Sequence, residues 1–315
     1  MGYAIEIIGL KKTYRSGVRR KSVTALNGLD LCVNENEIFG FLGPNGAGKT
    51  TTLKILVGLL FPSAGSASVL GRPLGDLSVK AKIGFLPENP YFYEYLTCRE
   101  LLDFYCRLFS IHKAERGKRV DRLLARVSLE HAADRQVRKL SHGMLQRLGI
   151  VQSLINDPEV LFLDEPMAGL DPVGRRTIRE MIHELKAEGK TIFFSSHILQ
   201  DAELLCDHVG ILREGRLVNT GTLQEMLTPK RASYEAVVTG VPNDAIDELS
   251  RVADKLERRE NRVHLLINGM DNLGRMERIV AQSGGLIDSL TKTRGTLEDH
   301  FIEFISPELK GNAEE

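Results

Sequence analysis

The stretch that decides the fold is FGFLGPNGAGKTTTLKILVGLL, which runs from Phe39 to Leu60. It places three glycines between an apolar strand-like run and an apolar helix-like run. Glycine lets the backbone adopt positive φ and approach a ligand closely, so three of them at such a corner predict a loop that wraps a ligand. Gly43, Gly48, Lys49 and Thr50 fit the G-x-x-x-x-G-K-[ST] pattern, whose backbone N–H groups form an anion-binding nest at a helix N-terminus. The predicted ligand is a nucleoside triphosphate.

Each part of this loop has a predicted role. The loop amides would cradle the α- and β-phosphates, Lys49 would neutralise the β- and γ-phosphate oxygens, and the Thr50 hydroxyl would coordinate Mg²⁺. The residues predicted to bind the nucleotide here are Gly43, Pro44, Asn45, Gly46, Ala47, Gly48, Lys49, Thr50 and Thr51. The alternative, a tight turn between a strand and a helix, explains one glycine but not the lysine.

Composition limits the other functions. The 315 residues contain 42 basic and 42 acidic side chains, which removes the electrostatic footprint of a nucleic-acid binder, so we expect no nucleic-acid partner. Cys32, Cys98, Cys106 and Cys206 form no C-x-x-C pair, so they predict reduced thiols in a cytosolic protein rather than a zinc site or disulfides. No apolar run approaches the ~18 residues that span a bilayer. Membrane association would therefore depend on another component.

The hydrophobic pattern predicts an α/β core. Strands are expected at 4–8, 25–33, 37–42, 160–165 and 191–197, helices at 51–60 and 174–188, and a mostly helical region from 96 to 156. Strands separated by helices predict a parallel sheet, and the helical region, about 90–156 as a subdomain, is then an insertion. A hairpin with its turn at Glu214-Gly215 follows. The predicted class is a phosphate-loop ATPase core with a mixed sheet and a helical insertion.

The composition changes near Pro229, which predicts one domain at 1–228 and a C-terminal accessory domain at 229–315. The second domain is expected to contain strand 234–240, helix 244–253, a hairpin around 258–261, helix 272–282, strand 286–290 and helix 297–305. This order is a small α+β unit of the ferredoxin-like βαββαβ type with an additional C-terminal helix. It contains no cluster typical of catalysis, so dimer support, regulation, partner contact or plain stabilisation all remain open for it.

Two carboxylates end the apolar strand VLFLDE. Asp164 and Glu165 are costly at that position unless they meet a cation or a donor. The carboxyl end of the sheet also holds the ligand in such folds, so Asp164 is predicted to hold Mg²⁺, mostly through water, and Glu165 to polarise the attacking water. The alternative is a pair of exposed carboxylates that cap the next helix.

Three further motifs lie along the chain. LSHGMLQR, at 140–147, precedes the two carboxylates, and AGLD, at 168–171, and SSH, which ends at His197, come after them. Together with Lys49 and Asp164, they resemble the Walker A, signature, Walker B, D-loop and H-loop motifs of the ATP-binding cassette (ABC) ATPases. The resemblance covers about the first 225 residues. The signature distinguishes this pattern from kinases and small GTPases.

The resemblance implies a head-to-tail homodimer that sandwiches two ATP molecules. Ser141 and Gly143 of the signature would bind the nucleotide held by the partner, and Asp171 would lie in the D-loop that crosses between subunits. Ser141 is a suitable N-cap for a helix beginning near Gly143, which would direct the positive end of that helix at a γ-phosphate. A plain helix cap is the alternative for Ser141.

The resemblance also gives roles to two other side chains. His197 would reach the γ-phosphate and hold Glu165 and the water in line, whereas an isolated histidine at a strand end is more often a surface residue. Tyr14 resembles the aromatic residue that stacks on adenine, although packing is the common role of a single tyrosine. Basic residues surround it: Lys11, Lys12, Arg15, Arg19, Arg20 and Lys21. They favour a solvated loop, with contact to triphosphate or lipid headgroups as the alternative.

The sequence departs from the family pattern at three positions. Glu88 stands where glutamine is usual; it still offers an oxygen to Mg²⁺ or water, so it is a predicted catalytic and metal-binding residue. Its charge beside Glu165 would change the pH or metal dependence of turnover. His142 and Met144 replace the usual glycine and glutamine of the signature. Such variants resemble ABC exporters of the drug and polysaccharide type.

An aromatic cluster lies in the helical insertion. Its members are Phe85, Tyr91, Phe92, Tyr93, Tyr95, Phe104, Tyr105 and Phe109. The resemblance places this region at the groove that receives a helix of the membrane subunit, and helix-in-groove docking uses such anchors. The favoured interpretation is that most of them form the core of the insertion, although Tyr91, Phe92 and Tyr93 cannot all face one core.

The predicted function is the ATP-hydrolysing subunit of an ABC exporter. ATP and Mg²⁺ are the expected cofactors, separate ABC transporter membrane subunits the expected partners, and the cytoplasmic face of the cell membrane the expected, peripheral location. One alternative is a soluble ABC ATPase of translation or DNA repair, which would usually carry two cassettes, a coiled coil or a zinc insertion. An importer ATPase is the other.

Overall fold

The computed structural model describes residues 2–16, 21–228, 233–260, 262–293, 296–298 and 301. The chain divides into two compact units, which we call the N-terminal unit, up to Leu223, and the C-terminal unit, Gln224–His300. The predicted boundary at 228–229 stays a prediction, because residues 229–232 lie outside the described residues.

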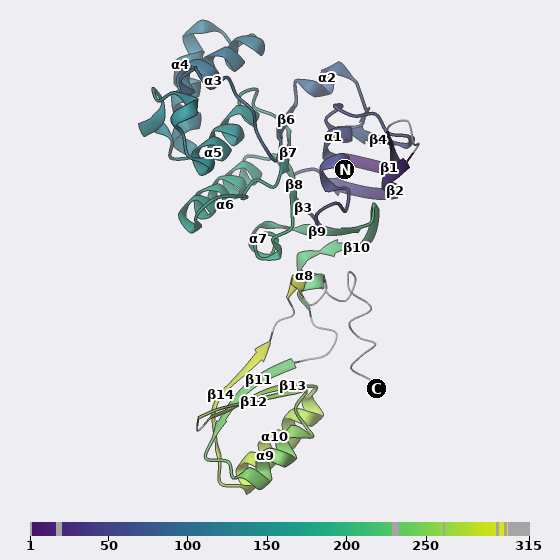
Figure 1. Cartoon of the computed structure of the whole chain (residues 1–315), viewed down its shortest axis with the longest axis vertical. Helices are drawn as coiled ribbons and strands as arrows, with labels where there is room; N and C mark the ends of the chain where they lie inside the picture. The colour runs from purple at the N-terminus through teal and green to yellow at the C-terminus, as the bar shows by residue number, and fades with distance from the viewer. Residues whose placement is uncertain are drawn as a thin grey trace. The chain divides into compact units, whose positions relative to one another are not determined.

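A six-stranded mixed sheet forms the centre of the N-terminal unit, with the order β10-β9-β3-β8-β7-β6 (Figure 1). Its strands are β3 (Ile38–Leu42), β6 (Ile83–Leu86), β7 (Val160–Asp164), β8 (Thr191–Ser196), β9 (His208–Arg213) and β10 (Arg216–Thr222). All neighbours are parallel except β9 and β10, which form the predicted hairpin around Glu214-Gly215. β3, β7 and β8 are buried at every position, as is typical of parallel strands covered on both faces.

Helices lie between the strands of this sheet along the chain. They are α1 (Lys49–Leu56), α2 (Leu77–Lys80), α6 (Pro172–Ala187) and α7 (Leu199–Leu205). α6 connects β7 to β8 directly, and α7 connects β8 to β9. α1 begins at Lys49, two residues before the predicted start, because the glycine loop leads directly into its first turn. The prediction of an α/β core with a mixed sheet is confirmed.

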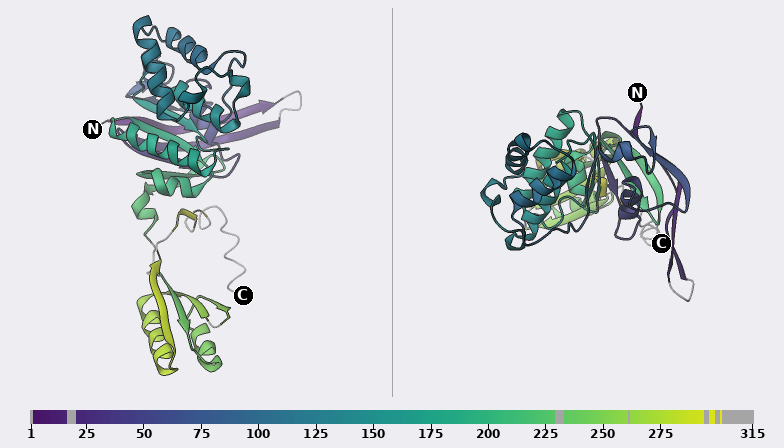
Figure 2. Two further views of the ribbon diagram at one scale, coloured as in Figure 1. Left: turned by 90° about the vertical axis from the view of Figure 1, so that its left-hand side faces the viewer. Right: turned by 90° about the horizontal axis from the view of Figure 1, so that it is seen from above.

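A second, antiparallel sheet has the order β2-β1-β4-β5. It consists of β1 (Tyr3–Ser16), β2 (Lys21–Asn34), β4 (Ala64–Val69) and β5 (Arg72–Pro73), and β1 and β2 run side by side as a long pair (Figure 2). The predicted strands at 4–8 and 25–33 were too short. Several register shifts along β1 interrupt the regular alternation that the sequence pattern depends on.

The helical insertion contains α3 (Cys98–Leu108), α4 (Lys113–Arg126) and α5 (His142–Ser153), with short 3₁₀ turns at Glu130–Ala132 and Val137–Lys139. A capping box starts α3: the Thr97 side chain accepts from the Glu100 N–H, and the Glu100 carboxylate accepts from the Thr97 N–H. The predicted helical region is confirmed.

The interpretation of the aromatic cluster as mainly core is wrong. Only Phe92 of the eight is buried, and the side chains of Tyr91, Tyr93, Tyr95 and Phe109 are exposed. The buried stripe of α3 consists instead of smaller side chains: Cys98, Leu101, Leu102 and Cys106. The four exposed aromatic rings therefore form a surface feature of the insertion.

The C-terminal unit contains β11 (Ser233–Thr239), α9 (Asn243–Ser250), β12 (Lys255–Arg259), β13 (Arg262–Asn268), α10 (Met270–Gln282) and β14 (Leu286–Thr293), after a short α8 (Leu223–Met226). The sheet is antiparallel, with the order β12-β13-β11-β14, and α9 and α10 lie on one face (Figure 1). The predicted βαββαβ order is confirmed. The predicted helix at 297–305 lies largely outside the described residues.

Candidate nucleotide-binding site

The glycine loop links β3 to α1 at the middle of the six-stranded sheet, because β3 pairs with β8 on one side and β9 on the other. Gly48 has φ 113°, and a Cβ there would lie 2.6 Å from the Ala25 carbonyl oxygen. A Cβ on Gly43 would lie 2.4 Å from the Leu212 carbonyl oxygen. Close backbone approach thus requires glycine at both positions of the predicted phosphate loop.

Lys49 is buried at the first turn of α1. Its Nζ donates to the Gly43 carbonyl oxygen at 2.6 Å and lies 3.5 Å from Glu165 Oε1. Both charged side chains are less than a tenth exposed. A buried ammonium is stable there because carbonyl and carboxylate oxygens surround it, which are also the groups that a phosphate could replace.

Asp164 lies at the end of β7, beside the end of β8. The Ser195 hydroxyl donates to Asp164 Oδ1 at 2.6 Å and accepts from the Glu165 N–H at 3.0 Å. Burial raises the pKa of Asp164, while hydrogen bonds from Ser195 and Thr50 oppose the rise. The second carboxylate oxygen, Oδ2, is buried with no hydrogen-bond partner among the described residues.

This unpartnered oxygen, next to the Thr50 hydroxyl, fits a hard cation such as Mg²⁺, which prefers oxygen ligands. In the part of the chain that the structure describes, no three His, Cys, Asp or Glu side chains gather as a metal site.

Glu165 is held from three sides. Its Oε2 lies 2.9 Å from His197 Nδ1, its Oε1 faces Lys49, and its backbone carbonyl accepts from Gln146 Nε2 at 3.1 Å. Its φ is 50°, a left-handed conformation that is uncommon for a residue with a Cβ. The structure thus brings Lys49, Glu165 and His197 together as the sequence motifs suggested.

Sequence reasoning missed Ser195 and Gln146. Both are fully buried polar residues, one in the buried strand β8 and one in the signature helix α5. The signal that could have found them is a polar residue within a buried run, because such a group needs a hydrogen-bond partner.

A cavity of about 280 Å³ opens over the loop. Its lining residues are Ala25, Pro44, Asn45, Gly46, Gly48, Lys49, Thr50, Thr51, Glu88 and Glu165. Glu88 is exposed at its rim, and Ala47, which is buried, does not line it. Seven of the nine predicted loop residues, all except Gly43 and Ala47, therefore share one cavity with Glu88 and Glu165.

Tyr14 lies close to this loop, with its hydroxyl 3.3 Å from Thr51 Oγ1 and its ring partly exposed. Lys12 Nζ lies 5.4 Å from the centre of the ring and donates to the Phe61 carbonyl oxygen. Of the six basic residues near Tyr14, only Lys11 and Lys12 have described side chains.

The signature and D-loop residues lie outside the lining of that cavity. Ser141 N-caps α5 by accepting from the Met144 N–H at 3.3 Å, as predicted, and Gly143 lies in the first turn. Asp171 N-caps α6 by accepting from the Gly174 N–H at 2.7 Å. The contact of these residues with the nucleotide of a partner subunit stays a prediction.

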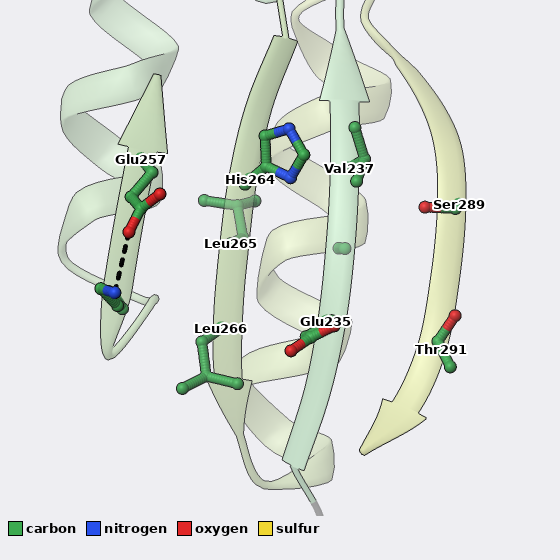
Figure 3. Close-up of a pocket in the computed structure, with 10 residues that line it drawn as sticks. Glu235, Val237, Glu257, His264, Leu265, Leu266, Ser289 and Thr291 are labelled. Atoms are coloured by element: carbon green, nitrogen blue, oxygen red, sulfur yellow. Dashed lines mark ion pairs between the residues drawn. The ribbon is translucent and has the colours of Figure 1, made fainter. Parts of the chain in front are cut away.

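A larger cavity, of about 370 Å³, lies on the sheet face of the C-terminal unit opposite its helices (Figure 3). Glu235, His264, Ser289 and Thr291 line it, and Glu257 there pairs with Lys255 at 2.8 Å. These charges are exposed or mutually paired, so the cavity lacks the buried, converging groups of the loop site.

The comparisons with known proteins agree with this geometry. Residues 26–168 match the family model described as ABC transporter. The chain is 44% identical to an ABC transporter ATP-binding protein of Synechocystis over 95% of this chain and 83% of that protein. It is 36% identical to the bacitracin transport ATP-binding protein BcrA of Bacillus licheniformis, over 97% of this chain and 98% of that protein.

A solved dimeric ATP-binding cassette in a post-hydrolysis state, bound to ADP and Pi, matches with a TM-score of 0.65 and 26% identity over 70% of this chain and 98% of that one. The fold and the site define an ATP-binding, ATP-hydrolysing class of protein. The chain belongs to the ABC transporter family as an ATP-binding subunit. In the described residues, no helix is both long and apolar enough to cross a membrane.

Proposed function

We propose that this chain binds and hydrolyses Mg-ATP to drive export through separately encoded membrane subunits. The observation that supports it best is the convergence of Lys49, Glu165 and His197 at the end of three adjacent parallel strands. A buried base, a buried cation and a histidine that holds the base in place suit phosphoryl transfer to water.

In the proposed mechanism, the loop amides and Lys49 bind the phosphates, and Glu165 accepts a proton from the attacking water. His197 fixes the Glu165 carboxylate through the 2.9 Å contact, so that Oε2 keeps one orientation. Asp164 and Thr50 would hold Mg²⁺, with Glu88 close by; when bound, the ion neutralises charge on the phosphate oxygens. Tyr14 would bind the adenine, since its ring lies at the edge of the loop.

We further propose an ATP-sandwich homodimer. Ser141 and Gly143 would present the N-terminus of α5 to the nucleotide of the partner subunit, and Asp171 would follow the D-loop across the interface. The matched cassette of 26% identity was solved as a dimer, which supports the same assembly here.

Membrane subunits would dock on the aromatic surface of the helical insertion. Tyr91 is 86% exposed and Tyr95 68% exposed, and Tyr93 packs its ring edge-on against Phe104, with centroids 5.7 Å apart. Exposed aromatic side chains beside the Glu88 loop provide anchors for an apolar helix. This docking would keep the protein on the cytoplasmic face of the membrane as a peripheral subunit.

Export is the proposed direction, because relatives with this function in their names match the chain. One is the Nod factor export ATP-binding protein of Ralstonia nicotianae, which is 39% identical over 71% of this chain; the name of BcrA gives transport without a direction. The export name favours this function over the two alternatives, a soluble ABC ATPase and an importer ATPase.

Glu165→Gln tests the ATPase mechanism. The substitution keeps the shape of the side chain but removes the base, so turnover falls about 100-fold and an ATP-bound dimer accumulates on size exclusion. Glu159→Gln is the matched control, because Glu159 precedes the same strand and pairs with Lys82 on the surface. A Glu165→Gln protein that stays monomeric with Mg-ATP contradicts the sandwich.

A pull-down tests the transporter function. The tagged protein is recovered from gently solubilised native membranes, and the ATPase activity of the recovered material is assayed. A multi-span membrane protein that changes turnover is the expected partner. Recovery of ribosomes or DNA-repair proteins alone would contradict the proposal.

A further inference from the structure

Asp201 is a buried carboxylate that the mechanism above does not use. It lies in α7, four residues after His197, and its side chain is only 5% exposed. Two arginines of α6 face it: Arg175 Nη1 is 3.5 Å from Oδ2, and Arg179 Nη1 is 3.5 Å from Oδ1. A buried carboxylate with two guanidinium partners fixes α6 against α7.

The two arginines differ in two contacts. Arg179 Nη1 donates a hydrogen bond to Asp201 Oδ1, whereas Oδ2 has no hydrogen-bond partner among the described residues, so Arg175 contacts Asp201 as an ion pair only. Arg175 Nε also donates to the Leu170 carbonyl oxygen at 3.3 Å, whereas no such bond to the loop joins Arg179 among the described residues. Leu170 belongs to the AGLD segment at 168–171. Arg175 therefore connects a buried anchor on α7 to the backbone of the D-loop.

The D-loop in turn lies against the signature helix. A Cβ on Gly143 would lie 3.3 Å from Leu170 Cδ2, and a Cβ on Gly169 would lie 3.0 Å from the ring of His142. His142, one of the departures from the family pattern, thus packs directly over Gly169. A shift of the loop would displace the first turn of α5.

We propose that Arg175, anchored by Asp201, is a positioning residue that seats the D-loop against the first turn of α5. The segment that begins after His197 is thereby coupled to the two segments that face the partner subunit. The inference rests on the proposed function, in which these segments act in the dimer, and it deepens that function by naming the connection within one subunit.

The test compares Arg175→Gln with Arg179→Gln in the full chain. Both variants remove one partner of Asp201 from the same helix, and both side chains are partly exposed, at 31% and 25%. Only Arg175→Gln removes the bond to the D-loop. We expect turnover to fall about tenfold in Arg175→Gln and to change less than about twofold in Arg179→Gln, with the apparent KM for ATP unchanged in both.

Hydrogen exchange provides a readout that does not depend on activity. The amides of Ala168 and Leu170 are hydrogen-bonded to the Glu165 and Met167 carbonyl oxygens. They are expected to exchange about tenfold faster in nucleotide-free Arg175→Gln and at the normal rate in Arg179→Gln. Asp201→Asn is expected to reproduce the faster exchange; if that variant does not fold, the two arginine variants still decide.

Equal effects of the two arginine variants, or no faster exchange in Arg175→Gln, would overturn the proposal. An unmodified chain without ATPase activity would instead contradict the proposed function. The exchange measurement separates the two failures, because it needs no turnover.

Discussion

The sheets of the two units differ in where their charged residues lie and in how deeply these are buried. In the N-terminal unit, β3, β7 and β8 are buried at every position, and the one charged residue among them, Asp164, lies at a carboxyl end. In the C-terminal unit, β13 alternates between buried and partly exposed residues, and the face without helices carries Glu235, Glu257 and His264. The larger of the two cavities lies on this second sheet.

The difference shows that buried charged groups, rather than the size of a cavity, identify the candidate active site of this molecule. Asp164 and Glu165 are tolerated inside a covered sheet because Ser195, Lys49 and His197 contact them. On the open face, a carboxylate such as Glu257 needs no such partner network because water solvates it.

Of the substitutions that test this comparison, Lys49→Ala is expected to have the largest effect on turnover. It removes the cation that contacts the phosphates and leaves the buried Glu165 without its ion-pair partner, so turnover falls about 100-fold or more. Titration with a fluorescent ATP analogue and an ATPase assay measure the loss. Lys54→Ala, at an exposed position of the same helix, is the control. Normal ATP affinity and normal turnover in Lys49→Ala would contradict the assignment of the glycine loop as the nucleotide-binding site.

Asp164→Asn is expected to have an intermediate effect, on stability. Burial raises the pKa of Asp164, so its stabilising contribution is present below the ordinary pKa of aspartate and is lost as pH rises through the raised value. Asparagine removes the buried charge and still accepts a hydrogen bond from Ser195. Tm is therefore expected to rise by about 2 °C at pH 7 and not to rise at acid pH. Thermal melts of the variant and the parent at pH 7 and at acid pH measure the change in Tm.

Asp157→Asn is the control of opposite sign. A hydrogen bond from Lys190 lowers the pKa of Asp157, so its contribution is present above the ordinary pKa and is lost as pH falls through the lowered value. The control is therefore less stable than the parent at pH 7. A loss of Tm in Asp164→Asn at that pH would contradict the account of the buried carboxylate.

Glu257→Gln is expected to have the smallest effect. Lys255 and Arg259 lower the pKa of this exposed group through surface hydrogen bonds, and such pairs contribute little. Turnover of the full chain is expected to change less than about twofold, and Tm by less than about 1 °C. A tenfold loss of ATPase turnover in Glu257→Gln would contradict this expectation and show that the open face contributes to activity.

The sequence predicted the parts of the fold whose pattern is local. The phosphate loop, the buried strands at 160–165 and 191–197 and the βαββαβ order follow from glycine spacing, apolar runs and periodicity. It did not predict β4, AGSASV, which has little apolar pattern and becomes a strand through pairing with β1. Tertiary pairing overrides local propensity there.

The site was predicted to a similar extent. The motifs supplied Lys49, Asp164, Glu165 and His197, which the structure brings together. They did not supply Ser195, Gln146 or the link from Asp201 to the D-loop, because these contacts join segments distant in the sequence. A single sequence contains no direct signal for such pairs.

The backbone at Glu165 has a consequence for protein engineering. A residue with φ of 50° would be less strained as glycine or asparagine, and either one would also remove a charge from the interior. The same replacement would leave the buried Lys49 ammonium without its ion-pair partner, so a screen for heat resistance alone registers two opposing effects at this position and not the loss of the base. Thermostable variants of this chain need a second selection, for ATP turnover, in the same round.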